Sequence, residues 1–222
     1  MLLTQSVFNQ FIKYYQINGI YVLQQFIRHF LISIYGVLFA AILAIPLGIF
    51  VSSRYKLSKT LIGIANVIQT IPSLAMMTIL MIGMGLGTKT VVMTVALYSF
   101  LPILKNTTAG INSVPDSLLD AARGMGMTRW QRIIKVELPL SISVIIAGIR
   151  NALIVAIGIT TIGTFIGAGG LGDIITRGIN VADGSAIILA GAIPTAFMAI
   201  LIDLLLGRIE VILTPQNGLI TK

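Results

Sequence analysis

Few residues in this sequence could carry out catalysis or bind a metal. The 222 residues contain no cysteine, a single histidine, His29, and seven carboxylates. Thiol chemistry, disulfides and a zinc or haem site of the ordinary kind are therefore excluded. The carboxylates do not stand in pairs suited to general acid–base catalysis, and no nucleophile stands beside a base. The sequence predicts no enzyme active site, no metal site and no bound cofactor.

Two glycine-rich segments imitate nucleotide-binding motifs without meeting their requirements. Gly167, Gly169 and Gly172 fit G-x-G-x-x-G, but that fingerprint needs a preceding strand and a βαβ unit. Here it follows an apolar run, so we favour a re-entrant turn or gate loop. The segment 83–90 misses the P-loop spacing by one residue. Any ATP and Mg²⁺ must therefore be bound by a partner chain.

The composition indicates that a lipid bilayer surrounds these residues. Hydrophobic residues make up 56% of the chain and charged residues only 10%, whereas soluble domains carry charge on about a quarter of their residues. The formal net charge of +8 comes from basic residues between apolar runs, where they set topology and meet anionic headgroups. We therefore expect no nucleic-acid partner.

The apolar segments predict five membrane-spanning helices, since a hydrocarbon core of about 30 Å needs roughly 20 residues. The expected spans are residues 30–51, 61–82, 90–105, 141–166 and 186–206. The third is short, but Lys89 and Lys105 can snorkel to the two surfaces. Residues 1–29 are expected to form an amphipathic helix at the interface, ahead of a transmembrane domain of residues 30–222. Pro72 should face the bundle interior, because it frees a backbone carbonyl that needs a partner.

The distribution of basic residues predicts the orientation. An outside amino terminus leaves only four basic residues outside, namely Lys13, Arg28, Lys89 and Arg177. The positive-inside rule favours this arrangement. The carboxyl terminus and the segment 106–140 then lie in the cytoplasm.

Residues 106–140 predict two short helices around a glycine elbow. A helix is expected from Asp116 to Arg123, after Pro115. Gly124 and Gly126 permit a sharp turn, and Thr128 can cap a second helix over 129–136. Leu138-Pro139 should then redirect the chain into the fourth span. Exposed apolar side chains beside arginines suggest a docking surface, and the residues concerned are Met125, Met127 and Trp130.

The stretch DAARGMGMTRWQRIIKVELP, residues 120–139, resembles the cytoplasmic signature of binding-protein-dependent ABC importer permeases. That signature runs Glu-Ala-Ala, three residues, Gly, nine residues, Ile, one residue, Leu-Pro. The sequence departs from it at Asp120 and Val136, which replace glutamate and isoleucine. In that family the segment is a coupling helix seated on the ATPase. The resemblance implies coupling roles for Asp120, Ala121, Ala122, Gly126, Met127, Trp130, Leu138 and Pro139.

Further strings narrow the resemblance to the glycine betaine, carnitine and choline permeases. These are QTIPSLA at 69–75, LPILKNTTAGI at 101–111, AGIRNA at 147–152 and GAGGLGDIITRGI at 167–179. The resemblance implies an all-α polytopic protein of the type I ABC importer permease kind, in a bacterial cell membrane. It also implies an ABC ATPase dimer, a second permease copy or paralogue, and a separate extracytoplasmic substrate-binding protein. The alternatives are a permease for an amino acid such as methionine, and a secondary transporter or channel.

Polar groups within the spans are candidates for the translocation path and its gate. With Pro72, the path candidates are Gln69, Tyr98, Asn151 and Thr161. Arg150 and Asp203 lie at matching depths, and we hypothesise that they share a polar network near an inner gate. The alternative is that each snorkels separately to the cytoplasmic surface.

Overall fold

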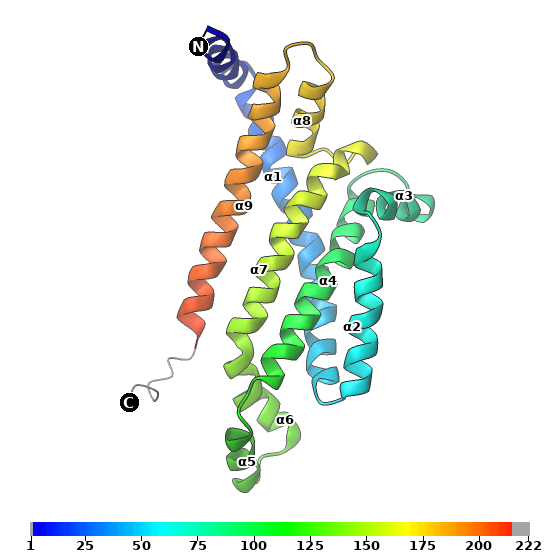
Figure 1. The fold of residues 1–222 in the computed structure, drawn as a ribbon, viewed down its shortest axis with the longest axis vertical. Helices are drawn as coiled ribbons and strands as arrows, with labels where there is room; N and C mark the ends of the chain where they lie inside the picture. Colours follow the sequence, from blue (N-terminus) through cyan, green and yellow to red (C-terminus); the bar gives the residue numbers. More distant parts are fainter. Residues whose placement is uncertain (1, 215–222) are drawn as a thin grey trace.

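The computed structural model describes residues 2–214 and contains no strand within that range. The helices are α1 (Leu2–Ser52), α2 (Tyr55–Thr70), α3 (Ser73–Met84), α4 (Thr88–Asn112), α5 (Asp116–Gly124), α6 (Arg129–Arg132), α7 (Leu138–Ile162), α8 (Leu171–Ile179) and α9 (Ser185–Leu213). A π-helical turn, Ile133–Glu137, joins α6 to α7, and a 3-10 turn, Gly163–Ile166, follows α7. Figure 1 shows α1, α4, α7 and α9 running along the long axis, with α8 at one end and α5 and α6 at the other.

Helix α4 occupies the centre of the bundle, packed between α1 and α7 and also contacting α2 and α3. Glycines allow the close approach of these helices. A Cβ atom on Gly36 of α1 would lie 2.3 Å from the Val95 side chain, and one on Gly148 of α7 would lie 2.7 Å from Asn106 Cβ. In lipid, where helices associate mainly through packing, such small residues let backbones come together. The buried core around α4 is accordingly held by close helix contacts.

Four helical stretches are long and apolar enough to cross a membrane, and a bent helix pair raises this number to five within residues 2–214. The bent pair is α2 and α3, which meet at 97°. The expected second span over 61–82 thus falls on a bent helix pair with a corner at Pro72 rather than on one straight helix. Pro72 is exposed in the single chain, so the expected inward orientation is wrong. Its extended ψ of 135° ends the helical path and turns α3 outward.

The expected redirection of the chain at Leu138-Pro139 is wrong as well, because the helix continues from α6 into α7. Pro139 lies in the first turn of α7, directly after the π-helical turn Ile133–Glu137. A proline ring clashes with the carbonyl four residues earlier and lacks a donor. The wider π turn alters that hydrogen-bonding register, which explains how the helix passes through the proline.

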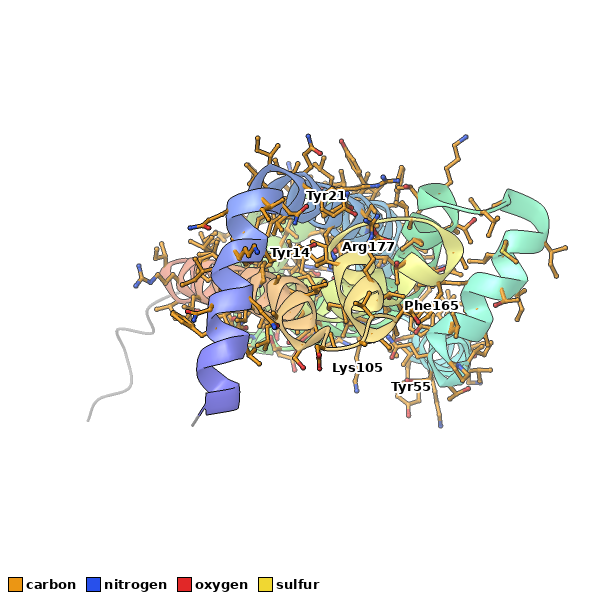
Figure 2. All side chains as sticks on the ribbon, turned by 90° about the horizontal axis from the view of Figure 1, so that it is seen from above. Tyr14, Tyr21, Tyr55, Lys105, Phe165 and Arg177 are labelled. Atoms are coloured by element: carbon orange, nitrogen blue, oxygen red, sulfur yellow. The ribbon has the colours of Figure 1, made fainter. Side chains whose placement is uncertain are left out.

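Helix α1 is also continuous, so the structure has no boundary at residue 29. Its first turns cross the end of the bundle, as Figure 2 shows for the part that carries Tyr14. The later turns run along the bundle axis (Figure 1). The predicted interfacial segment and the first span are thus two parts of one helix of 51 residues.

Candidate functional site

The elbow at the lower end of the bundle in Figure 1 is formed by α5 and α6. Gly126 adopts a φ of +75°, a left-handed conformation that favours glycine. The Met127 N–H donates to the Ala122 carbonyl at 3.1 Å and closes the turn. Ala122 is buried, whereas Ala121 and Asp120 are exposed. The elbow therefore presents one face of α5 to the surroundings and packs the other against α6 and the π-helical turn.

Helix α6 begins with a reciprocal cap, as the sequence predicted for Thr128. The Thr128 Oγ1 accepts from the Gln131 N–H at 3.3 Å, and Gln131 Oε1 accepts from the Thr128 N–H at 2.8 Å. This capping box satisfies two donors that a helix start leaves open. Met125 and Trp130 are exposed, as expected, but Met127 is half-buried. At the start of α7, Leu138 is half-buried and Pro139 is exposed.

Polar contacts attach the elbow to the ends of the long helices. Arg129 donates to Ser53 Oγ, just after α1, at 2.6 Å. Arg132 pairs with Glu137 at 2.9 Å between their side-chain atoms. A polar pocket of about 200 Å³ lies between these contacts and the end of α4 at Asn112. The elbow is thus attached to the end of α1 and to the π-helical turn that leads into α7.

An ion cluster joins the lower halves of α7 and α9. Arg150 donates to Asp203 at 2.5 Å and to Glu210 at 3.1 Å. A Cβ atom on Gly207 would lie 3.3 Å from the Arg150 guanidinium, so this glycine leaves room for the arginine to pass. All three charged side chains are between 30% and 36% exposed. The structure brings Arg150 and Asp203 together and adds Glu210, which the sequence reading missed.

The path candidates lie in three separate places. Gln69 donates to the Tyr98 carbonyl at 2.7 Å, and the Tyr98 hydroxyl donates to the Ile71 carbonyl. These bonds hold the α2–α3 corner on α4, beside the exposed Pro72. Asn151 is exposed on α7, while Thr161 bonds within its own helix to the Ile157 carbonyl at 3.0 Å. Of these candidates, Gln69 and Tyr98 share a hydrogen bond, and the Tyr98 hydroxyl reaches the residue before Pro72.

At the opposite end, His29 holds the glycine-rich turn after α7. Its Nδ1 accepts from the Leu171 N–H at 3.3 Å, so Nε2 carries the proton and donates to the Ile157 carbonyl at 3.1 Å. Gln25 accepts from the Gly170 N–H at 2.7 Å. The predicted glycine-rich turn is thus an irregular link between α7 and α8, and positive φ angles occur at Gly167, Gly169 and Gly170.

Figure 2 shows Tyr21 and Arg177 at this same end. Tyr21 donates to Asp173 at 2.6 Å, and Arg177 pairs with the same carboxylate at 2.9 Å while its guanidinium lies 5.1 Å from the Tyr21 ring centroid. These contacts fasten α8 to the early part of α1.

Comparison with known proteins places this architecture in a family. Residues 36–216 match the model of the "Binding-protein-dependent transport system inner membrane component". The chain belongs to this family. It is 61% identical over 209 residues to the carnitine transport permease protein OpuCD of Listeria monocytogenes, covering 94% of each chain. It is 57% identical over 210 residues to the glycine betaine/carnitine/choline transport system permease protein OpuCD of Bacillus subtilis, covering 95% and 92%.

Solved structures agree on the fold of this inner membrane component. The MetNI methionine ABC transporter in an inward-facing conformation superposes with a TM-score of 0.78 at 21% identity, covering 87% of this chain and 96% of that chain. An amino acid ABC transporter gives a TM-score of 0.66 at 22% identity, covering 93% and 97%. The all-α polytopic fold of an ABC importer permease, expected from the sequence, is confirmed.

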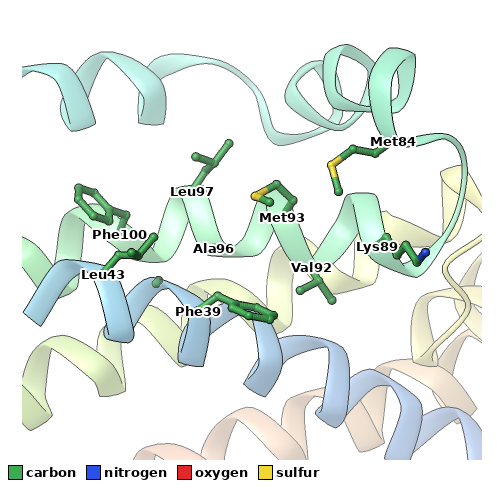
Figure 3. A pocket seen from close by; sticks show the side chains of 10 residues that line it. Phe39, Leu43, Met84, Lys89, Val92, Met93, Ala96, Leu97 and Phe100 are labelled. Atoms are coloured by element: carbon green, nitrogen blue, oxygen red, sulfur yellow. The ribbon is translucent and has the colours of Figure 1, made fainter.

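A groove on the side of this inner membrane component does not suit a polar solute. It has a volume of about 370 Å³ and lies between α1, α3 and α4, as Figure 3 shows. Apart from Lys89 at one end, its lining is apolar and includes Phe39, Leu43, Met93 and Phe100. A surface with so few hydrogen-bonding groups fits hydrocarbon rather than a charged solute.

Proposed function

We propose that this chain is the membrane-spanning permease subunit of an ABC importer for quaternary-ammonium osmoprotectants such as carnitine, glycine betaine and choline. The observation that carries the proposal is the 61% identity, over 94% of both chains, to a carnitine transport permease. A choline transport system permease protein of Bacillus subtilis is 54% identical over 95% of this chain. The likeness to a methionine transporter is at 21% identity and supports the fold alone.

The α5–α6 elbow is the proposed contact with a separate ATPase, which binds ATP and Mg²⁺. Exposed Asp120 and Ala121 offer a small surface ending at Gly126, and Asp120 is already paired with Arg123 at 2.8 Å. Because Arg129 and Arg132 attach the elbow to α1 and to the turn before α7, a push on α5 reaches the membrane-spanning helices. The positive-inside rule supports a cytoplasmic position for this end and an outside amino terminus.

The proposal includes two further partners: a second permease copy or paralogue, and a binding protein at the outer end of the bundle. The exposed Asn151 amide on α7 would be costly against lipid, so we propose that it faces a translocation path shared between two copies. The glycine-rich turn held by His29 lies at the end where a binding protein would deliver solute. The Arg150 cluster fastens α9 near the inner end of that path.

Reconstitution tests the proposal directly. The chain is purified with its ATPase and inserted into liposomes, and the binding protein is added outside. Uptake of labelled carnitine, glycine betaine and choline is expected to require both ATP and the ATPase, with methionine as the control solute. Uptake that persists without the ATPase would instead identify a secondary transporter, and preferential uptake of methionine would reassign the substrate.

A further inference from the structure

A second pocket lies beside the elbow, on the flank of the bundle rather than at its tip. It has a volume of about 360 Å³ and is formed by the last turns of α1 and by the continuous segment from α6 into α7. Its apolar lining comprises Pro46, Ile49, Phe50, Trp130, Ile133, Ile134 and Leu138. Ile134 and Phe50 are 60% and 49% exposed, so the pocket is open to whatever surrounds the protein.

One arginine lines this pocket, and a second lies over the ring of one of its lining residues. The Arg54 guanidinium lies 4.2 Å from the Phe50 ring centroid, and Arg129 lines the pocket while bonding Ser53. Neither forms an ion pair with a carboxylate in residues 2–214. Arg129 also borders the polar pocket that contains Glu137, but that carboxylate is engaged by Arg132. Asp116 lines the same polar pocket but forms no ion pair with Arg129, so neither arginine at the apolar pocket is paired with a carboxylate of the described chain.

The depth of the pocket indicates what covers it. Its floor belongs to helices that cross the membrane. Pro46 lies six residues before the end of α1 at Ser52, which places it about 9 Å deeper along the helix axis. An ATPase in the aqueous phase cannot reach this depth, whereas an acyl chain can. Trp130, 71% exposed, lies at the rim, and tryptophan is enriched at the membrane–water interface.

We propose that this pocket binds an anionic phospholipid, with an acyl chain against Phe50 and Leu138 and the phosphate between Arg54 and Arg129. Basic pockets between membrane helices on the cytoplasmic side suit anionic headgroups, and guanidinium groups suit phosphate oxygens. The proposal moves Trp130 from the ATPase contact to the lipid contact. It does not depend on which solute is transported.

The single tryptophan of this chain provides the test. The complex of permease and ATPase is placed in nanodiscs that contain brominated phosphatidylglycerol or brominated phosphatidylcholine, and the fluorescence of a Trp130→Phe complex is subtracted. We expect Trp130 to be quenched more strongly by the anionic lipid. Each arginine is expected to raise the affinity for the anionic lipid about fivefold, so Arg54→Gln with Arg129→Gln should abolish the stronger quenching.

The matched control is Lys56→Gln with Lys59→Gln, which removes the same charge from exposed positions of α2 outside the pocket. The preference should survive in this variant. Equal quenching by the two lipids would show ordinary boundary lipid and overturn the proposal. Absence of quenching by either lipid would also overturn it, since the ATPase or a second permease copy would then cover Trp130.

Discussion

Gly126 permits a sharp test of the elbow geometry. Its φ is +75°, and a Cβ atom there would meet no heavy atom within 4 Å. Replacement by alanine in Gly126→Ala therefore acts through the backbone rather than through a clash within this chain. A left-handed conformation costs an L-residue roughly 1–2 kcal/mol, so the native elbow should lose a factor of about 5–30 in population relative to its opened forms.

Hydrogen exchange measures this loss at the elbow itself. The Met125 and Met127 amides donate to the Ala121 and Ala122 carbonyls at 3.0 and 3.1 Å, and they exchange when the turn opens. In Gly126→Ala these amides should exchange about 5–30 times faster. Amides of α4, in the centre of the bundle, should be unaffected, because the perturbation is local.

Two further variants decide whether the reasoning is right. In Gly124→Ala the new Cβ also meets nothing within 4 Å, and the residue is helical, so exchange should be no faster than in the wild type. Gly126→Asn should recover part of the protection, because asparagine enters the left-handed region more readily than alanine. If Gly124→Ala opens the turn as much, or if asparagine is as disruptive as alanine, the requirement for glycine does not come from φ.

Three other outcomes are expected. Gly36→Val should destabilise the bundle by about 1–3 kcal/mol in a thermal melt, since its Cβ would lie 2.3 Å from Val95. The control Gly19→Val, where a Cβ meets nothing within 4 Å, should be nearly neutral. Equal effects of the two variants would refute the close α1–α4 packing. Tyr98→Phe leaves the Ile71 carbonyl without its donor and should cost about 1–3 kcal/mol, seen as a lower melting temperature, while the exposed Tyr35→Phe is the neutral control. Glu210→Gln should lower the melting temperature in the wild type but much less in an Arg150→Gln background, because the two side chains belong to one ion cluster. Additive shifts in melting temperature would show that Arg150 and Glu210 are not coupled.

The sequence predicted features whose signals are local. The Thr128 cap follows from a threonine three residues before Gln131, and the elbow follows from Gly126. Both need only neighbouring residues. The membrane-spanning character likewise follows from long apolar runs, which no soluble fold explains.

Features that depend on distant contacts were not accessible in this way. The proline at position 72 was visible, but the 97° bend is accompanied by a bond from Tyr98 of α4 to the carbonyl of Ile71, in the corner between α2 and α3. His29 bonds backbone groups 128 and 142 positions away, and backbone partners leave no mark in a sequence. Glu210 could have been found, since it lies seven residues after Asp203 and therefore on the same helical face.

Helix α1 touches both ends of the molecule. Near one end, Gln25 and His29 accept hydrogen bonds from the turn before α8, and just past its other end Ser53 accepts from Arg129 of the elbow. From His29 to Ser52, 23 residues further along, α1 rises by about 35 Å, and the helix continues through its interior Pro46. One continuous helix therefore carries the contacts of both ends, so the elbow and the turn before α8 are linked through a single element.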